Sequence, residues 1–188
     1  MLATRNAHKV IEMRRLLEAS GVALEPLPEG VELPPEVGDT FAENALPKAR
    51  TAARSLGRPA IADDSGIEAE ALGGAPGVRS ARYAGEGATD AANLAKLRRE
   101  ASAGSALRYV CALAYVDPGS GEEHVAFGEC RGRLAPEARG TRGFGYDPVF
   151  LPEEYGQTRT MAELSDAEKD AISHRGTAAR ALVQWLRG

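Results

Sequence analysis

AIADDSGIEAEAL, residues 60–72, places two adjacent carboxylates directly after a short apolar run. The run at 60–62 predicts a strand, and residues 67–72 predict a second strand after the turn signal Ser65-Gly66. Neighbouring side chains of an extended chain point to opposite faces. We therefore expect one of the carboxylates of Asp63 and Asp64 to face a cleft and the other to face the scaffold.

The segments before this stretch alternate between short apolar runs and helical spacing. Residues 2–4 and 22–27 predict strands, and the apolar positions between them predict a helix that ends at Gly21. A loop rich in Pro and Glu follows at 28–38. Thr40 and Glu43 form a capping-box pattern for a helix that reaches about residue 56. Pro47 lies inside this helix, so we expect a kink or a late start.

The segments after it complete a mixed pattern. A Gly-rich connection at 73–87 precedes a helix capped by Thr89, and residues 107–116 and 125–134 predict a hairpin. Ser165 and Glu168 form another capping box, and a helix near 173–186 follows. The mixture predicts an α/β (mixed α+β) sheet fold. Without repeats or linkers, residues 1–188 are expected to form a single domain.

Composition excludes several classes of protein. The 188 residues carry a net charge of −4, which argues against a nucleic-acid-binding surface. No apolar run is long enough for a membrane span. The start MLATRNAHK lacks the apolar region of a signal peptide, so we expect a cytoplasmic protein. Cys111 and Cys130 match no metal-ligand spacing and are expected to be reduced thiols of the core.

Two constellations predict phosphate chemistry. Asp63 and Asp64 are the oxygen ligands that Mg2+ prefers together with substrate phosphates, and such a carboxylate can also activate water. The alternative is an acidic turn. Residues 4–9, Thr-Arg-Asn-Ala-His-Lys, place backbone N–H groups and Lys9 at a helix start, which favours an anion. The alternative is an ordinary strand-to-helix turn, and the glycines of a Walker A loop are missing.

Two more constellations lie toward the C-terminus. The turn at 143–147, Gly-Phe-Gly-Tyr-Asp, allows a close backbone approach, stacking of an aromatic ring on a base, and acceptance by Asp147. Lys169 and the run Ser-His-Arg at 173–175 offer partners for phosphate. A packed Gly-rich turn and a charged helix end are the alternatives. The chain has four lysines against 19 arginines, so Lys9 and Lys169 are unusual choices.

Taken in order, five stretches resemble the inosine/xanthosine triphosphate pyrophosphatase family, the RdgB/HAM1-like house-cleaning enzymes. They are ATRNAHK, TFAENALPKA, IADDSGIEAEALGGAPGVRSARYAG, GFGYDPVF and AELSDAEKDAISHRGTA, and they span nearly the whole chain. The resemblance implies an elongated central mixed sheet flanked by helices, with two lobes and a deep substrate cleft, usually in a homodimer. It implies a Mg2+-dependent hydrolase that converts ITP, dITP and XTP to the monophosphate and pyrophosphate.

The resemblance also implies roles for particular residues. Asp64 is implied as the general base, and the metal site as Glu36, Asp63 and Asp64. The implied substrate contacts are Thr4, Arg5, Asn6, Ala7, His8, Lys9, Ser65, Phe144, Gly145, Tyr146, Asp147, Lys169, His174 and Arg175. Of these, His174 and Arg175 are candidates for reading O6 of the purine. Arg5 departs from the family pattern, which often has glycine there, and this could alter phosphate geometry.

Two alternatives stay open at this point. One is a Maf-like nucleotide pyrophosphatase that acts on pyrimidine or modified nucleotides. The other is a nucleotide-sensing protein that binds a purine nucleotide and no longer catalyses its hydrolysis. The intact pair Asp63-Asp64 and Lys169 argue against the second alternative, and release of pyrophosphate from ITP would decide it.

Overall fold

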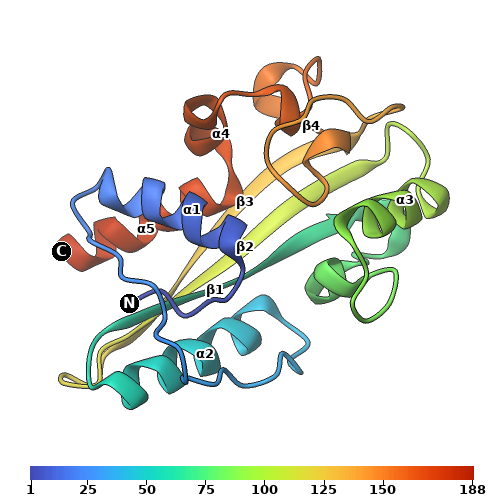
Figure 1. Ribbon diagram of the computed structural model, residues 1–188. Coiled ribbons are helices and arrows are strands. Elements are labelled where there is room, and N and C mark those ends of the chain that lie inside the picture. The colour runs from blue at the N-terminus through green and yellow to red at the C-terminus, as the bar shows by residue number, and fades with distance from the viewer. The chain divides into compact units, whose positions relative to one another are not determined.

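The computed structural model describes residues 1–188 and contains helices and one sheet (Figure 1). The α-helices are α1 (Ala7–Glu18), α2 (Phe41–Leu56), α3 (Asp90–Glu100), α4 (Asp166–Ile172) and α5 (His174–Arg187). The strands are β1 (Ala60–Ala69), β2 (Ala106–Val116), β3 (Glu123–Leu134) and β4 (Phe150–Pro152). Short 3-10 helices connect several of these elements. The expected α/β class is confirmed.

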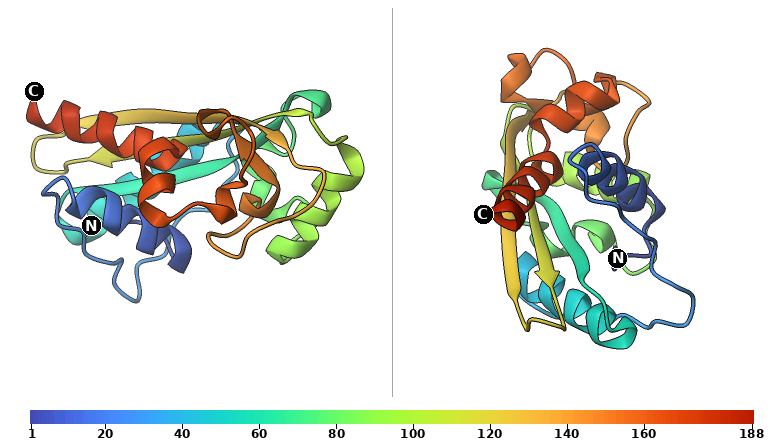
Figure 2. Two further views of the ribbon diagram at one scale, coloured as in Figure 1. Left: turned by 90° about the horizontal axis from the view of Figure 1, so that it is seen from above. Right: turned by 90° about the vertical axis from the view of Figure 1, so that its left-hand side faces the viewer.

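The strands form a four-stranded sheet in the order β1-β2-β3-β4. The hairpin of β2 and β3 is the one expected from the turn at 117–121, and the two strands lie side by side up to that turn (Figure 2). β4 pairs antiparallel with the end of β3, with Arg133 opposite Leu151. Leu2 adds isolated parallel bridges to Pro26 and Ile61 outside these four strands, and the mixed sheet implied by the resemblance is not seen in the four strands themselves. The strands expected at 2–4 and 22–27 are not formed, and these segments contribute only the isolated bridges.

β1 runs without interruption through both aspartates. We expected a turn at Ser65-Gly66 and a second strand to residue 72, and this was wrong. Residues 60–64 are all buried, and the strand continues to Ala69 before a 3-10 helix at Glu70–Leu72. Because the strand is buried, its backbone N–H and C=O groups must pair within the sheet. This requirement outweighs the local turn preference of Ser65-Gly66. The two carboxylates therefore sit in regular strand geometry, on opposite faces.

The helix starts follow the local capping signals. Thr40 and Glu43 form the expected capping box of α2, Thr89 caps α3, and Ser165 with Glu168 caps α4. α2 begins at once after Thr40, so the late start expected from Pro47 is wrong. Proline in a helix interior costs about 3 kcal/mol. The buried face of α2, which is mostly alanine, offsets that cost by packing.

The chain divides into two compact units, each assembled from separated segments. The first unit comprises Met1–Asp64, Cys111–Gly128 and His174–Gly188, and the second comprises Ser65–Val110 and Glu129–Ser173. Each has its own apolar core. Cys111 lies in the first core and Cys130 in the second, both free and buried as expected. The cleft between lobes and the single domain over residues 1–188 stay predictions.

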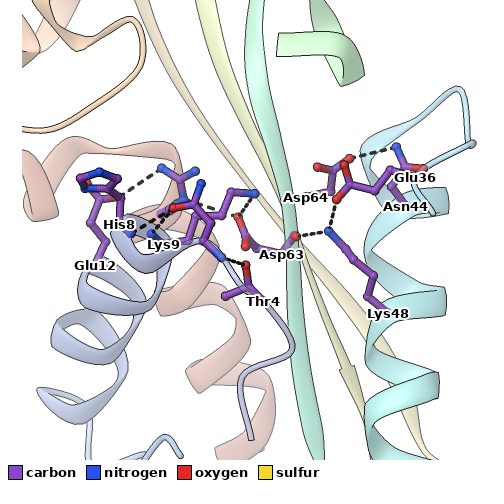
Figure 3. A network of polar contacts seen from close by, with 11 residues as sticks. Thr4, His8, Lys9, Glu12, Glu36, Asn44, Lys48, Asp63 and Asp64 are labelled. Carbon is purple, nitrogen blue, oxygen red and sulfur yellow. Dashed lines mark hydrogen bonds and ion pairs between the residues drawn. The ribbon is translucent and has the colours of Figure 1, made fainter. Parts of the chain in front are cut away.

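Within the first unit, residues 60–64 of β1 run between α1 and α2 (Figures 1 and 3). α1 packs against α5, so the N-terminal and C-terminal helices belong to the same core. None of the helices in the structure combines the length and the apolar character that crossing a membrane requires.

Candidate active site

The start of α1 forms one side of the candidate site. Thr4 Oγ1 accepts a hydrogen bond from the Asn6 backbone N–H at 3.2 Å. The Asn6 side chain in turn accepts from the N–H groups of His8 and Lys9 at 3.0 and 3.2 Å. The helix is thus capped by its own sequence. The positive end of its dipole and the Lys9 ammonium remain as the attraction for an anion.

Lys9 reaches from this helix to Asp63 on β1 (Figure 3). Its Nζ lies 3.1 Å from Asp63 Oδ2, and Arg175 Nε lies 3.5 Å from the same oxygen. Arg175 also pairs with Glu12 through Nη1 at 3.1 Å. The Asp63 side chain is fully buried. Burial alone would raise its pKa, but Lys9, Arg175 and Lys48 together hold the pKa of Asp63 well below its usual range.

Asp64 lies in different surroundings on the other face of β1 (Figure 3). Its Oδ2 accepts a hydrogen bond from Asn44 Nδ2 at 3.0 Å. Burial raises the pKa of Asp64, and the nearby Glu36 carboxylate raises it further against the opposing effect of Lys9 and Lys48. The expectation that the two carboxylates face opposite ways is confirmed. Of the two carboxylates, Asp64 is the one whose pKa is raised.

Lys48 connects Glu36 to β1. Its buried Nζ lies 2.6 Å from Glu36 Oε1 and donates to the Asp63 carbonyl oxygen at 2.7 Å. Asn44 also contacts the loop before α2, because its Oδ1 accepts from the Gly38 N–H at 2.8 Å. These two α2 side chains thus fix the loop that carries Glu36 next to Asp64.

Sequence reasoning missed Asn44, Lys48 and Glu12 as site residues. Lys48 had a usable signal, since it is one of four lysines in a chain that otherwise uses arginine. Asn44 lies in the family-like stretch TFAENALPKA, which gave it no particular role, and nothing local distinguishes Glu12. Their roles depend on which segments the fold brings next to them.

The remaining predicted contacts of the first unit vary in exposure. The guanidinium of Arg5 donates to three carbonyl oxygens of the loop at 27–31. Ala7 and His8 are exposed on the first turn of α1. His174 is buried at the start of α5. A Cβ atom at Gly128 would lie 2.1 Å from the His174 carbonyl oxygen, so only glycine lets β3 approach α5 this closely.

The second unit holds the other predicted contacts. Lys169 Nζ lies 2.6 Å from Asp147 Oδ2, and both side chains are buried. Asp147 also accepts from the Tyr109 hydroxyl and the Phe144 N–H, each at 3.0 Å. A Cβ at Gly143, whose φ is +71°, would lie 2.0 Å from Asp147 Oδ2. The turn at 143–147 therefore packs closely around the carboxylate of Asp147 and leaves no room for a side chain at Gly143.

Two further residues of this turn have structural partners. Gly145 donates its N–H to Asp90 Oδ2 at 2.8 Å, which ties the turn to the start of α3. The Tyr146 hydroxyl donates to the Ser80 carbonyl oxygen at 2.8 Å, and the ring is buried in the second core. Ser65, which follows Asp64 on β1, is half-buried.

The carboxylates near Asp64 suit one kind of metal site. No group of three or more His, Cys, Asp or Glu side chains is arranged to hold an ion by itself. Glu36 and Asp64 lie close enough for repulsion between them, which a divalent cation would relieve. Mg2+ is commonly held by one or two carboxylates, with substrate phosphates and waters completing its shell. These two residues fit such a site, whereas Asp63 is committed to Lys9 and Arg175.

Comparison with known proteins gives consistent matches over the whole chain. The Ham1 family model matches residues 1–185. A dITP/XTP pyrophosphatase of Frankia alni is 52% identical over 100% of this chain and 96% of the relative. One of Mycobacterium tuberculosis is 47% identical over 100% and 94%.

Solved structures agree with the sequence comparison. A HAM1 protein from Coxiella burnetii superposes with a TM-score of 0.86 at 41% identity, covering 99% of this chain and 96% of that one. A nucleoside-triphosphatase, or dITP/XTP pyrophosphatase, from Mycobacterium abscessus gives a TM-score of 0.74 at 44% identity, covering 100% and 98%.

Proposed function

Because the chain belongs to the Ham1 family, we propose that it hydrolyses the non-standard purine nucleotides ITP, dITP and XTP to the monophosphate and pyrophosphate. The names of its relatives support this activity. The observation that carries it is the contrast between Asp63 and Asp64. Asp63 is surrounded by cations that lower its pKa, whereas Asp64 has a raised pKa and lies beside the Glu36 carboxylate.

The chemistry follows from that contrast. Asp64 accepts a proton from a water molecule whose oxygen attacks the α-phosphorus. The bond from the α-phosphorus to the oxygen that bridges to the β-phosphorus breaks, and pyrophosphate leaves with the bonding electrons. A raised pKa makes Asp64 a stronger base than an exposed aspartate.

The charge of the substrate must be balanced by the protein and a metal. A nucleoside triphosphate carries about four negative charges, so cations are needed near the reacting phosphate. Lys9 and the start of α1 bind phosphate oxygens, and Asp63 holds Lys9 in place. Glu36 and Asp64 would hold Mg2+, which when bound neutralises charge on the phosphate oxygens.

Base selectivity rests on hydrogen-bond donors that face the purine C6 position. A carbonyl at C6 satisfies such donors, whereas the amino group of adenine leaves one unpaired at a cost of about 1–3 kcal/mol. His174 and Arg175 are our candidates. Arg175 is held by Glu12 and Asp63, so its direction is fixed before a nucleotide binds. The family resemblance adds Phe144, Asp147 and Lys169 to the nucleotide contacts.

The setting of the enzyme follows from the same resemblance. We expect a homodimer, which light scattering on the purified protein tests directly. We also expect the protein to act in the cytoplasm, because a house-cleaning enzyme must meet the pool of free nucleotides. Its task there is to remove deaminated purines before polymerases can use them.

The decisive experiment is a pyrophosphate-release assay with Mg2+ over a panel of ITP, dITP, XTP, GTP, ATP and pyrimidine nucleotides. We expect kcat/KM to be highest for the first three, and about 10- to 100-fold lower for ATP from one mismatched donor. Comparable values for ATP and ITP would refute the house-cleaning role. A preference for pyrimidines would favour the Maf-like alternative, and binding of ITP without any release would favour the nucleotide sensor.

A further inference from the structure

The loop at 28–38, which carries Glu36, has few attachments of its own. It contains no helix or strand, only a turn at residues 29 and 30. Val37 is 84% exposed. At its C-terminal end the loop is held by the Lys48–Glu36 ion pair and by Asn44 on Gly38. Something else must hold its N-terminal end.

Arg5 supplies that attachment. Its Nη1 donates to the Leu27 carbonyl oxygen at 3.1 Å, and its Nη2 donates to those of Pro28 and Val31 at 2.8 and 3.0 Å. A planar guanidinium can serve three acceptors from one fixed position, which a lysine ammonium on a flexible stem does not reproduce. The loop is thus tied across a span of five residues by one side chain.

Arg5 lies next to the residues proposed to bind phosphate. It lies between Thr4 and Asn6, whose side chains build the cap at the start of α1, the proposed phosphate site. The other end of the tied loop carries Glu36, the proposed metal ligand. One arginine therefore connects the segment for phosphate with the segment for the metal.

We propose that Arg5 is a positioning residue, which holds the loop at 27–31 so that Glu36 is presented beside Asp64. Its guanidinium serves loop carbonyls, and phosphate binding is left to Lys9 and the helix start. The metal-related half of this inference rests on the proposed function. The competing role is a direct contact of the Arg5 charge with the triphosphate.

Limited proteolysis tests the tie without any substrate. A glutamate-specific protease is applied to the full-length protein without nucleotide or metal, and cleavage at the exposed residues Glu29 and Glu32 is followed by mass spectrometry. Loss of the fork in Arg5→Lys should raise cleavage there about fivefold, because such cleavage follows the open population of the loop. Arg98→Lys is the matched control, since Arg98 donates to the Pro136 carbonyl elsewhere in the chain. Equal rates in Arg5→Lys and wild type would overturn the tie.

The dependence of turnover on Mg2+ tests the consequence. Arg5→Lys and Arg5→Ala should both raise the Mg2+ concentration for half-maximal pyrophosphate release from ITP by about fivefold. Without the Arg5 hydrogen bonds, Glu36 must be ordered when Mg2+ binds, and this ordering reduces the free energy of Mg2+ binding. A direct phosphate contact predicts instead that Arg5→Lys stays near wild type while Arg5→Ala raises KM. That result, or an unchanged Mg2+ dependence, would overturn the positioning role. If wild type releases no pyrophosphate from any nucleotide, the proposed function fails, and the cleavage rates still judge the tie.

Discussion

The two units hold their buried charges differently. In the first unit, three buried carboxylates, Glu12, Asp63 and Asp64, stand against two buried cations, Lys48 and Arg175. The half-buried residues Glu36 and Lys9 add one charge of each sign. In the second unit, one carboxylate meets one cation, Asp147 and Lys169, with the Tyr109 hydroxyl and the Phe144 N–H as neutral donors. The first arrangement is one negative charge in excess, and the second is balanced.

That difference separates an arrangement that attracts a cation from one that fixes the conformation of a turn. A balanced buried pair gives a turn a defined conformation, because neither partner can leave without exposing the other to an uncompensated charge. An arrangement with an extra carboxylate is less stable by itself and attracts a cation. The excess falls on Asp64, whose pKa is raised, while its neighbour Asp63 has a lowered one.

The largest expected effect comes from neutralising the excess carboxylate. Asp64→Asn removes the proposed general base and should lower kcat by about 10²- to 10⁴-fold, the usual contribution of such a group. Pyrophosphate release from ITP and a thermal melt are measured together. Asp117→Asn, in the β2–β3 turn, is the control, because asparagine can still accept from the Gly119 N–H. A folded Asp64→Asn variant with near-normal kcat would contradict the assignment.

Breaking the balanced pair should mainly affect stability. Lys169→Ala leaves the Asp147 carboxylate buried without its cation, which typically lowers the free energy of unfolding by about 3–5 kcal/mol. Affinity for ITP should fall as well if Lys169 contacts phosphate. Urea denaturation gives the stability, and Lys96→Ala, at a half-buried lysine of the same unit, should lose much less.

A double variant separates charge from packing at this pair. Lys169→Met with Asp147→Asn removes both charges and should recover most of the lost stability. If the double variant is no more stable than Lys169→Ala, the pair does not act through its charges.

The two adjacent aspartates should respond to neutralisation with opposite signs. At neutral pH and without Mg2+, Asp63→Asn should lower the free energy of unfolding by about 1–3 kcal/mol, because it strips a carboxylate from its cations. Asp64→Asn should raise it by about 1 kcal/mol, as removal of a strained functional charge commonly does. Denaturation of both variants beside wild type gives the comparison, and two changes of the same sign would refute it.

The pH dependence of that stability follows from the two pKa shifts. The folded pKa of Asp63 is lowered, so its stabilising contribution is present at neutral pH and is lost as the pH falls below the ordinary value of about 4. The folded pKa of Asp64 is raised, so the folded state binds its proton more tightly. Its unfavourable contribution therefore grows as pH rises through that pKa, and the gain from Asp64→Asn should vanish in acid.

The smallest expected effect is on the pH profile of turnover. Asp64 must be ionised to accept a proton, so kcat/KM should fall as pH decreases through its raised pKa. At limiting Mg2+ the acid limb should thus lie above the ordinary aspartate value of about 4, because a bound cation would lower the pKa of Asp64 again. Profiles of kcat/KM for ITP between acid and neutral pH measure it, and a limb at or below the ordinary value would contradict the raised pKa.

Local signals in the sequence predicted the helices well. Thr40, Thr89 and Ser165 each cap the helix expected of them, because a cap is decided by residues within one turn. The β2–β3 hairpin was likewise readable from its turn. The strand boundaries near the N-terminus and the turn expected within β1 failed, since pairing with distant segments decides them.

For the site, too, only features that depend on neighbouring residues could be predicted from the sequence. Residues close together in sequence, such as Asp63 with Asp64, could be proposed from chemistry and resemblance, and their opposite orientations from strand geometry. The residues that set the pKa values of these two aspartates could not be proposed from the sequence. Asn44 meets Asp64 across 20 residues and Arg175 meets Glu12 across 163, and no local pattern encodes such pairs.

The separation of Glu12 from Arg175 also sets an order of events during synthesis. At roughly 5–20 residues per second, the ribosome needs roughly 8–33 s to extend the chain by the 163 residues from Glu12 to Arg175. Glu12 and Asp63 therefore wait without their arginine until the last of the three segments of the first unit, His174–Gly188, has been made. A chain that stops before residue 175 carries the four carboxylates and both lysines of the ionic cluster but lacks its arginine. The cluster therefore obtains its full set of cations only when synthesis is nearly complete.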